Sequence, residues 1–170
     1  MPKIRPESPL DRDAIETLLD VVFGKDRHGK ISYRYREGVE AITGLSHIAH
    51  DGGNLVATIR YWPISIGGNK TPALLLGPIA VAPDRKGEGI GIRLILETLE
   101  IAATMGTGIV VLVGELPYYA RFGFVPATEH GIIMPDESPE RVQVLFLNND
   151  LKGKISGQVQ KVGQSDASVA

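Results

Sequence analysis

The sequence predicts a mixed α/β (α+β) domain with a twisted, mostly antiparallel sheet of six to seven strands and flanking helices. Turn residues at 51–54 and at 67–69 separate β-rich apolar runs, which is typical of an antiparallel meander. Further along, the order strand, helix, strand at 74–81, 90–105 and 109–113 indicates one parallel βαβ unit. These two patterns together predict the fold class.

The composition predicts one domain and excludes several classes of function. The chain has 170 residues, of which 43% are hydrophobic, which is enough for a single core. A net charge of −2 provides no positive field for nucleic acid. Because cysteine is absent, disulfides, zinc–thiolate sites and cysteine nucleophiles are excluded, and we predict no metal site. The chain shows neither a signal peptide nor a run of about 18 apolar residues, so we expect a cytoplasmic protein that does not bind membranes.

The first half of the chain contains a strand, a helix and then the meander. A short strand is predicted at 3–5. Ser8, Pro9 and Asp11 start a helix, because serine caps, proline fits the first turn and the acid completes a capping box. Apolar residues recur at helical spacing up to Gly24, which ends this helix. A polar loop at 25–30 and a short helix at 31–39 then precede strands expected at 46–50, 55–66 and 73–81.

The turn at 83–91 is the most informative stretch. Gly87, Gly89 and Gly91 lie at every second position and leave the backbone open to a ligand. The N–H groups of this turn and the positive end of the following helix form an anion site suited to phosphate. A phosphate-bearing cofactor is therefore our first hypothesis. The helix at 90–105 has only a narrow polar stripe, so we expect it to be packed on most of its circumference.

The second half completes the sheet. Residues 109–113 are continuously apolar, as in a strand covered on both faces. A loop and a short helix follow at 114–124, and further strands are predicted at 132–134 and 141–147. We assign residues 1–153 to a single domain and residues 154–170 to a polar tail whose end is predicted to be disordered.

Two motifs occur in this order. The segment VAPDRKGEGIG, followed by an apolar helix, resembles the acyl-CoA signature Arg/Gln-x-x-Gly-x-Gly/Ala of the GNAT superfamily of N-acetyltransferases. The segment YARFGF at 119–124 resembles its downstream Tyr-x-x-x-Gly-Phe motif. The pattern LLLGPIAV, GEGIG, VVLVGELPYYARFGF is most similar to the compact bacterial YhbS-like branch. One departure is Lys86, at the position of Arg or Gln, which keeps the charge but loses the planar fork.

The resemblance implies acetyl-CoA as co-substrate, with its pyrophosphate on the glycine turn and its pantetheine arm along the strand that ends at 79–81. Gly77-Pro78 suits a bulge that separates this strand from the one at 109–113, because proline removes a ladder donor. A backbone N–H near the end of the strand would polarise the thioester carbonyl. The implied cofactor-binding residues are Ile79, Ala80, Val81, Lys86, Gly87, Glu88, Gly89, Ile90, Gly91 and Ile92.

The implied reaction is direct attack of a neutral primary amine on the acetyl carbon. By resemblance, Tyr119 is the acid that protonates the departing thiolate; the alternative is a core tyrosine beside Phe122 and Phe124. Glu115, after the strand at 109–113, is the best-placed carboxylate for the base, and the alternative is an exposed loop acid. Histidines 28, 47 and 50 also titrate near neutrality, although surface or strand roles are the simpler interpretation.

The acceptor is expected to be a small-molecule or peptide amine. Tyr33 and Arg36 lie where this family has its variable substrate wall, and Arg36 would suit an acceptor that also carries a carboxylate or phosphate. Solvation of Arg36 at the surface is the alternative. A homodimer is a further expectation, because dimers are common in the resembled family.

Rival functions are weighed against these motifs. A P-loop NTPase needs Gly-Lys-Ser/Thr after the turn, and a Rossmann site needs Gly-x-Gly-x-x-Gly; residues 87–93 match neither. The alternative that stays open is a non-catalytic acyl-CoA-binding sensor or scaffold. Such a module would keep the glycine turn without the acid and the acceptor wall.

Overall fold

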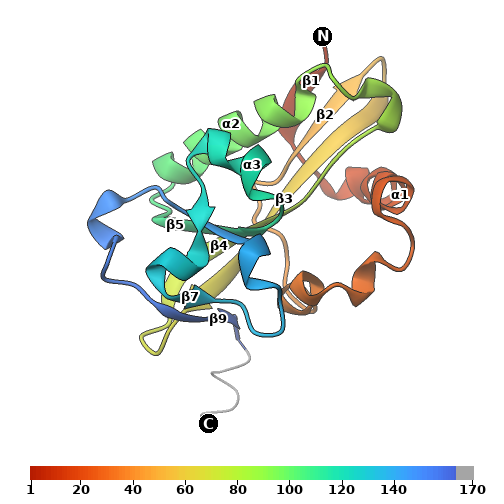
Figure 1. The fold of residues 1–170 in the computed structure, drawn as a ribbon. Helices are drawn as coiled ribbons and strands as arrows, with labels where there is room; N and C mark the ends of the chain where they lie inside the picture. The colour runs from red at the N-terminus through yellow and green to blue at the C-terminus, as the bar shows by residue number, and fades with distance from the viewer. Residues whose placement is uncertain (164–170) are drawn as a thin grey trace.

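A single twisted sheet organises the protein, and the computed structural model describes residues 1–163 (Figure 1). The predicted disorder at the C-terminal end therefore lies outside the described residues. Along the sheet, neighbouring strands follow the order β1 (Lys3–Pro6), β2 (His47–Asp51), β3 (Asn54–Ile66), β4 (Thr71–Val81), β5 (Ile109–Val113), β8 (Val142–Phe146) and β6 (Val125–Pro126). A further strand, β9 (Gly157–Lys161), pairs with the end of β3 and with β7 (Ile132–Ile133).

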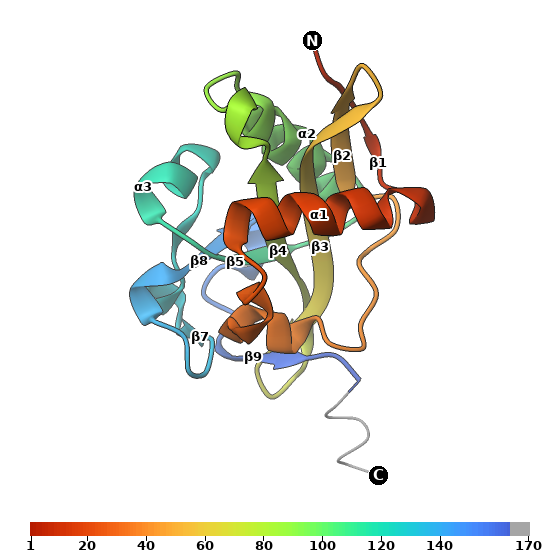
Figure 2. The same cartoon turned by 90° about the vertical axis from the view of Figure 1, so that its right-hand side faces the viewer.

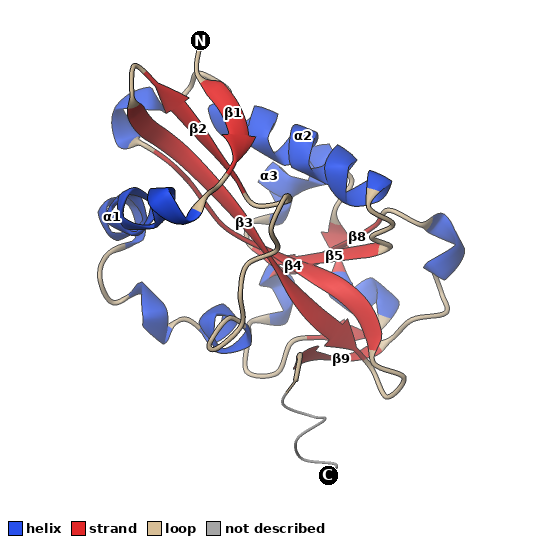
Figure 3. Ribbon diagram, turned by 180° about the vertical axis from the view of Figure 1, so that it is seen from behind, coloured by secondary structure: helices blue, strands red, loops and turns tan. Residues whose placement is uncertain are grey.

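The predicted mixed, mostly antiparallel sheet is confirmed. In the described chain, only β4 with β5 and β7 with β9 pair in parallel. The strands β1 to β4 are antiparallel neighbours (Figure 3). Within residues 1–163 the sheet has nine strands rather than six to seven. The extra strands are β6, which is two residues long, and β9, whose sequence GQVQK contains a single buried residue, Val159. The structure thus differs from the predicted boundary at residue 153, because part of the expected tail belongs to the sheet.

Two helices cover opposite faces of the sheet. Figure 2 shows α1 (Arg12–Phe23) lying across β3 and β4, with α2 (Ile90–Thr104) behind them. Helix α1 packs Ile15, Leu18 and Leu19 on Ile48 and Ala80. Helix α2 packs on the other face, where Leu94, Ile95 and Leu99 join a cluster that includes Ala57, Ile59 and Tyr61. A third, short helix, α3 (Leu116–Tyr119), follows β5.

Helix α2 is less covered than its sequence predicts. Its sheet-facing side is buried, but Leu96 and Met105, the residue directly after α2, are each 54% exposed. The apolar side chains outside the polar stripe therefore do not all face protein in the described chain. The expectation of packing around most of the circumference is wrong, because the sheet covers only one side of the helix.

The start of α1 follows the predicted capping chemistry. The N–H of Ser8 donates to the Asp11 carboxylate at 2.8 Å, and Arg5 donates to the same group at 2.7 and 2.9 Å. The hydrogen bonds from Arg5 hold the pKa of Asp11 at about 2. Residues Pro9–Asp11 form one turn of 3-10 helix before α1 begins at Arg12, and Gly24 ends α1 with a φ of 87°.

The strands of the βαβ unit separate at their carboxyl ends. β4 pairs with β5 only through Leu74 with Val110 and Leu75 with Val111. Beyond this point β4 stays with β3, with a register shift at 59–61, whereas β5 pairs with β8 as far as Val113. The separation lies at Gly77-Pro78, where the sequence predicted it. An edge of β4 that is not paired with β5 is thus available beside the glycine turn.

Candidate active site

Two cavities lie side by side where β4 and β5 diverge. The first, which we call the splay cavity, has a volume of about 600 Å³ and lies between the ends of β4 and β5 and the segment at 29–36. The second, the turn cavity, has a volume of about 560 Å³ and lies between β4 and the glycine turn. Phe23, Ile79, Tyr118 and Tyr119 line both cavities, so the two spaces share a wall.

The turn cavity is built largely from backbone. Gly89, with a φ of 78°, is the N-cap of α2, and the first hydrogen bond of the helix runs from the Arg93 N–H to the Gly89 carbonyl at 3.0 Å. The N–H groups of Ile90, Gly91 and Ile92 therefore have no acceptor within the helix. Together with the positive end of α2, they can bind an anion such as a pyrophosphate.

All the predicted cofactor-binding residues except Glu88 line this cavity. The Glu88 carboxylate instead accepts hydrogen bonds from Arg85 at 2.7 and 2.9 Å, which lowers its pKa. Arg85 also donates to Asp51 at 3.0 Å. Since Arg85 is held by two acids, Lys86 is the cation of the turn that is left for a ligand.

Gly91 keeps the turn cavity open. Its φ does not require glycine, unlike those of Gly87 and Gly89. A Cβ at Gly91 would lie 3.4 Å from Val81 and 3.7 Å from the Tyr118 hydroxyl, which are ordinary contact distances. A longer side chain here would occupy the space between α2 and β4. The glycine thus serves the cavity rather than the backbone conformation.

Tyr119 and Tyr118 form the shared wall. The Tyr119 ring packs on Gly114, where any Cβ would come within 2.5 Å of it, and lies 6.1 Å from Phe124 between ring centres. Burial raises the pKa of Tyr119 to about 12, so its hydroxyl is protonated at neutral pH. Tyr118 was not singled out from the sequence, but α3 directs it to the same wall. The signal in the sequence that could have indicated Tyr118 is its position next to Tyr119.

The splay cavity is built from side chains of distant segments. A 3-10 turn at Ile31–Tyr35 brings Tyr33 and the following Arg36, the two residues expected at the acceptor wall, to the lining of this cavity. Glu115 also lines it, but its side chain is 76% exposed and lies 3.6 Å from the Arg141 guanidinium. Lys30, Glu137 and Arg141 line the same cavity and were missed, because nothing local in the sequence connects them to it.

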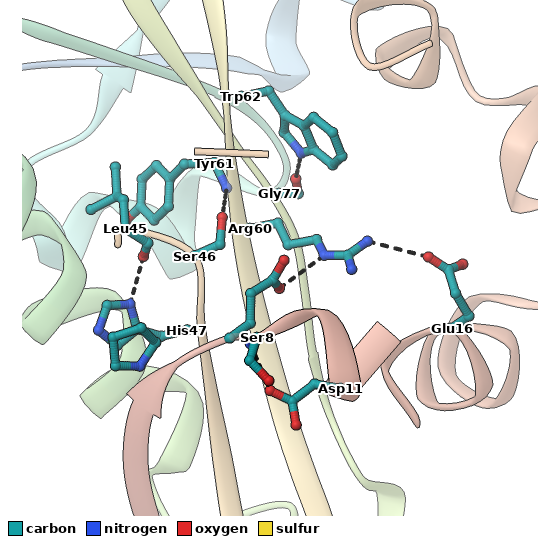
Figure 4. A network of polar contacts seen from close by, with 12 residues as sticks. Ser8, Asp11, Glu16, Leu45, Ser46, His47, Arg60, Tyr61, Trp62 and Gly77 are labelled. Atoms are coloured by element: carbon teal, nitrogen blue, oxygen red, sulfur yellow. Dashed lines mark hydrogen bonds and ion pairs between the residues drawn. The ribbon is translucent and has the colours of Figure 1, made fainter. Parts of the chain in front are cut away.

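The histidines lie elsewhere. None of the predicted three lines either large cavity. His47 is buried with its Nδ1 2.7 Å from the Leu45 carbonyl (Figure 4), and His28 contacts the Tyr33 ring beside a smaller cavity. In the described residues, no group of three His, Cys, Asp or Glu side chains is arranged to hold a metal ion. No helix of the described chain has the length and apolar character needed to cross a membrane.

Comparison with known proteins decides the family. Residues 3–127 match the family model of the acetyltransferase (GNAT) domain. The chain belongs to the GNAT family. As a GNAT protein it is 28% identical over 158 residues to the uncharacterized N-acetyltransferase YhbS of Escherichia coli K12, covering 92% of this chain and 94% of YhbS. It is 30% identical to the uncharacterized N-acetyltransferase YjhQ of the same strain, covering 83% and 80% of the two chains.

Solved structures of GNAT proteins share the fold. The structure of E. coli YhbS in complex with CoA has a TM-score of 0.83 and 26% identity, covering 97% of this chain and 92% of that one. A GNAT acetyltransferase from Brucella melitensis in complex with acetyl-CoA has a TM-score of 0.71 and 30% identity, covering 96% and 97%. The resemblance to the GNAT superfamily and the predicted enzyme class, an acyltransferase, are confirmed. Acetyl-CoA as the co-substrate is consistent with the ligands of these neighbours.

Proposed function

We propose that this protein transfers the acetyl group of acetyl-CoA directly to a primary amine. The observation that carries the proposal is the shared wall: a backbone anion site opens beside the unpaired edge of β4, and Ile79, Tyr118 and Tyr119 continue from there into the splay cavity. One cavity fits the cofactor and the other fits an acceptor. The CoA and acetyl-CoA complexes of the two structural neighbours support this arrangement.

The residues of the turn cavity hold the donor. The N–H groups at 90–92 and the Lys86 ammonium face the pyrophosphate, and the backbone of Ile79 to Val81 orients the pantetheine arm. When bound, acetyl-CoA supplies a thioester whose acetyl carbon forms a C–N bond with the amine as its C–S bond breaks. Backbone N–H groups on the open edge of β4 stabilise the developing oxyanion.

The acceptor nitrogen loses one proton before it attacks and a second as the amide forms, while the departing sulfur gains one. Tyr119 donates its phenolic proton to the departing sulfur, and its pKa of about 12 keeps that proton in place before the reaction. The ammonium form of the acceptor loses a proton to Glu115 through water, since Glu115 lies at the rim of the splay cavity. The second nitrogen proton returns to the Tyr119 phenolate, directly or through water, so that the acid is restored. Both roles are proposals that mutation can test.

The test has two steps. Titration calorimetry with acetyl-CoA, and with NADH as control, measures donor binding. Free-thiol release with a panel of amines then measures turnover. We expect Tyr119→Phe to lower kcat about 100-fold while the Kd for acetyl-CoA changes less than about threefold, because acid catalysis contributes about 100-fold or more. Tyr118→Phe is the matched control, since it removes the neighbouring hydroxyl of the same wall.

The outcomes distinguish between Tyr119 and Tyr118 as the acid, and between an enzyme and a binding module. Unchanged turnover in Tyr119→Phe would remove Tyr119 as the acid, and a loss confined to Tyr118→Phe would assign the role to Tyr118. Tight acetyl-CoA binding with no thiol release for any amine would favour the non-catalytic acyl-CoA-binding module instead. Absence of acetyl-CoA binding would contradict both. Cytoplasmic location and a homodimer stay predictions.

A further inference from the structure

Arg36 differs from the two other arginines buried near it. The Arg27 side chain is 2% exposed and forms ion pairs with Glu16 and Asp20. Arg60 forms ion pairs with Glu7 and Glu16, of which the second is labelled in Figure 4. By contrast, no carboxylate of the described residues forms an ion pair with Arg36, and its Nε and Nη1 atoms are buried without a hydrogen-bond partner. The guanidinium of Arg36 is thus largely enclosed and has no carboxylate counter-ion among the described residues.

The fold holds this guanidinium at the point where β4 leaves β5. Its centre lies 4.3 Å from the Tyr33 ring and 5.8 Å from the Trp62 ring. The Trp62 indole N–H donates to the Gly77 carbonyl at 2.6 Å (Figure 4), and a Cβ at Gly77 would come within 3.2 Å of Arg36 Nη2. The aromatic rings and the β4 backbone therefore fix the guanidinium plane at the wall of the splay cavity.

The unpaired state of Arg36 is unfavourable in the free protein. Burial lowers the pKa of Arg36 to about 10. The Tyr33 side chain opposes this shift, and the weaker effects of the Arg60 and Arg27 charges add to it. Contacts with aromatic rings offset part of the free-energy cost of burying this charge, but they do not satisfy the guanidinium N–H donors. An anion bound at Arg36 from the splay cavity would supply the missing charge.

The other charges of the splay cavity indicate what kind of anion fits. The Lys30 ammonium lies 4.5 Å from the centre of the Phe23 ring, and Arg141 faces Glu115. Glu115 and Glu137 add negative charge to the same lining. The lining thus carries three cations, Lys30, Arg36 and Arg141, against these two acids, a net charge of one positive that suits a singly charged anion better than a phosphate dianion. A carboxylate carries a single charge and matches the planar fork of a guanidinium with two hydrogen bonds.

We propose that Arg36 binds a carboxylate of the acceptor, so that the acceptor is a small amine that also carries a carboxylate, as an amino acid does. The inference rests on the proposed acetyl transfer to an amine and narrows the class of substrate. Arg36 then acts in substrate binding, at the opposite end of the acceptor from the reacting nitrogen.

The first experiment compares matched acceptors on the wild-type protein. The panel contains amino acids, their carboxamides and the corresponding amines without the carboxyl group, with phosphoethanolamine as the phosphate probe. Free-thiol release with acetyl-CoA gives kcat/KM for each. We expect the best amino acid to exceed its carboxamide by about 100-fold, because the carboxamide leaves the buried guanidinium without its charge partner.

The second experiment changes Arg36 and measures the same pairs. Arg36→Gln is expected to raise KM about 100-fold for the amino acid and less than about threefold for the carboxamide, with the Kd for acetyl-CoA unchanged; Arg36→Lys should restore part of the affinity. Arg34→Gln is the matched control, since Arg34 lies on the same turn but is 59% exposed and pairs with Asp136. Thermal unfolding checks that each variant is folded.

A binding measurement covers the case in which no amine of the panel reacts. Calorimetry with propionate and with amino acids should give heat for the wild type and Arg34→Gln, and none for Arg36→Gln. Equal turnover of acids and carboxamides would leave the acetyltransferase proposal standing and contradict the carboxylate inference. An equal loss for both in Arg36→Gln, preference for phosphoethanolamine, or propionate heat that persists in Arg36→Gln would also contradict it.

Discussion

The turn cavity and the splay cavity share a wall, but they are built in different ways. The turn cavity uses backbone N–H groups of consecutive residues, kept accessible by glycine. The splay cavity uses side chains from five separate stretches, at Phe23 and near 30–36, 75–79, 112–119 and 137–141. Backbone recognition tolerates side-chain change around it, whereas side-chain recognition depends on individual residues. The first cavity therefore suits a donor common to a family, and the second suits an acceptor particular to one protein.

The largest expected effect breaks the turn cavity without harming the fold. Gly91→Leu places a branched side chain between α2 and β4, where a Cβ alone already contacts Val81 and the Tyr118 hydroxyl. Because this φ does not require glycine and leucine favours helix, we expect the variant to stay folded. Acetyl-CoA affinity, measured by calorimetry, should fall at least about 100-fold, which corresponds to about 2.7 kcal/mol.

The control for this variant is Gly68→Leu. Gly68 lies in the turn between β3 and β4, and a Cβ there would meet nothing within 4 Å. This second variant should bind acetyl-CoA as the wild type does. If Gly91→Leu also kept wild-type affinity, the turn cavity would not be the cofactor site.

The next prediction concerns the stability cost of the unpaired arginine in the splay cavity. Replacing Arg36 by methionine removes an unpaired buried charge, so the free energy of unfolding in urea should rise by about 1–3 kcal/mol. Since the folded-state pKa of Arg36 is about 10, below its usual value, the charged form costs stability at all pH values below 10. The gain of the variant should be complete at pH 7 and should shrink as the pH rises above 10, where the folded wild type loses the proton.

Glu16→Gln is the contrasting variant. It removes an acid that neutralises both Arg27 and Arg60, so it should lower the free energy of unfolding by about 1–3 kcal/mol. The expected loss of stability is moderate because water partly screens the Glu16 side chain, which is 41% exposed. A loss of stability in Arg36→Met would mean that the fold, rather than a ligand, requires this arginine.

The same contrast explains what the sequence could predict. β5 was predicted with its observed bounds, and the glycine turn was located almost residue by residue, because apolar runs and alternating glycines are local patterns. Tyr33 and Arg36 were placed only by resemblance. Among the described residues, Arg36 has no ion-pair partner because the nearby acids pair with Arg27 and Arg60 instead. Glu137 and Arg141 reach the splay cavity through the loop before β8. Such relations are set by tertiary packing and have no signal in a single sequence.

The smallest effect concerns the proton on the acceptor. With an amine pKa of about 10, only a small fraction of the acceptor is neutral at pH 7, and Glu115 relayed through water would increase the rate about tenfold. Glu115→Gln should therefore lower kcat/KM about tenfold at pH 7 and approach wild-type values near pH 10, where the amine deprotonates without help. Glu137→Gln, at another carboxylate of the splay cavity, is the matched control. A deficit that is the same at every pH would assign Glu115 to holding Arg141 rather than to proton transfer, and a pH-dependent deficit in Glu137→Gln instead would transfer the role of base to that residue.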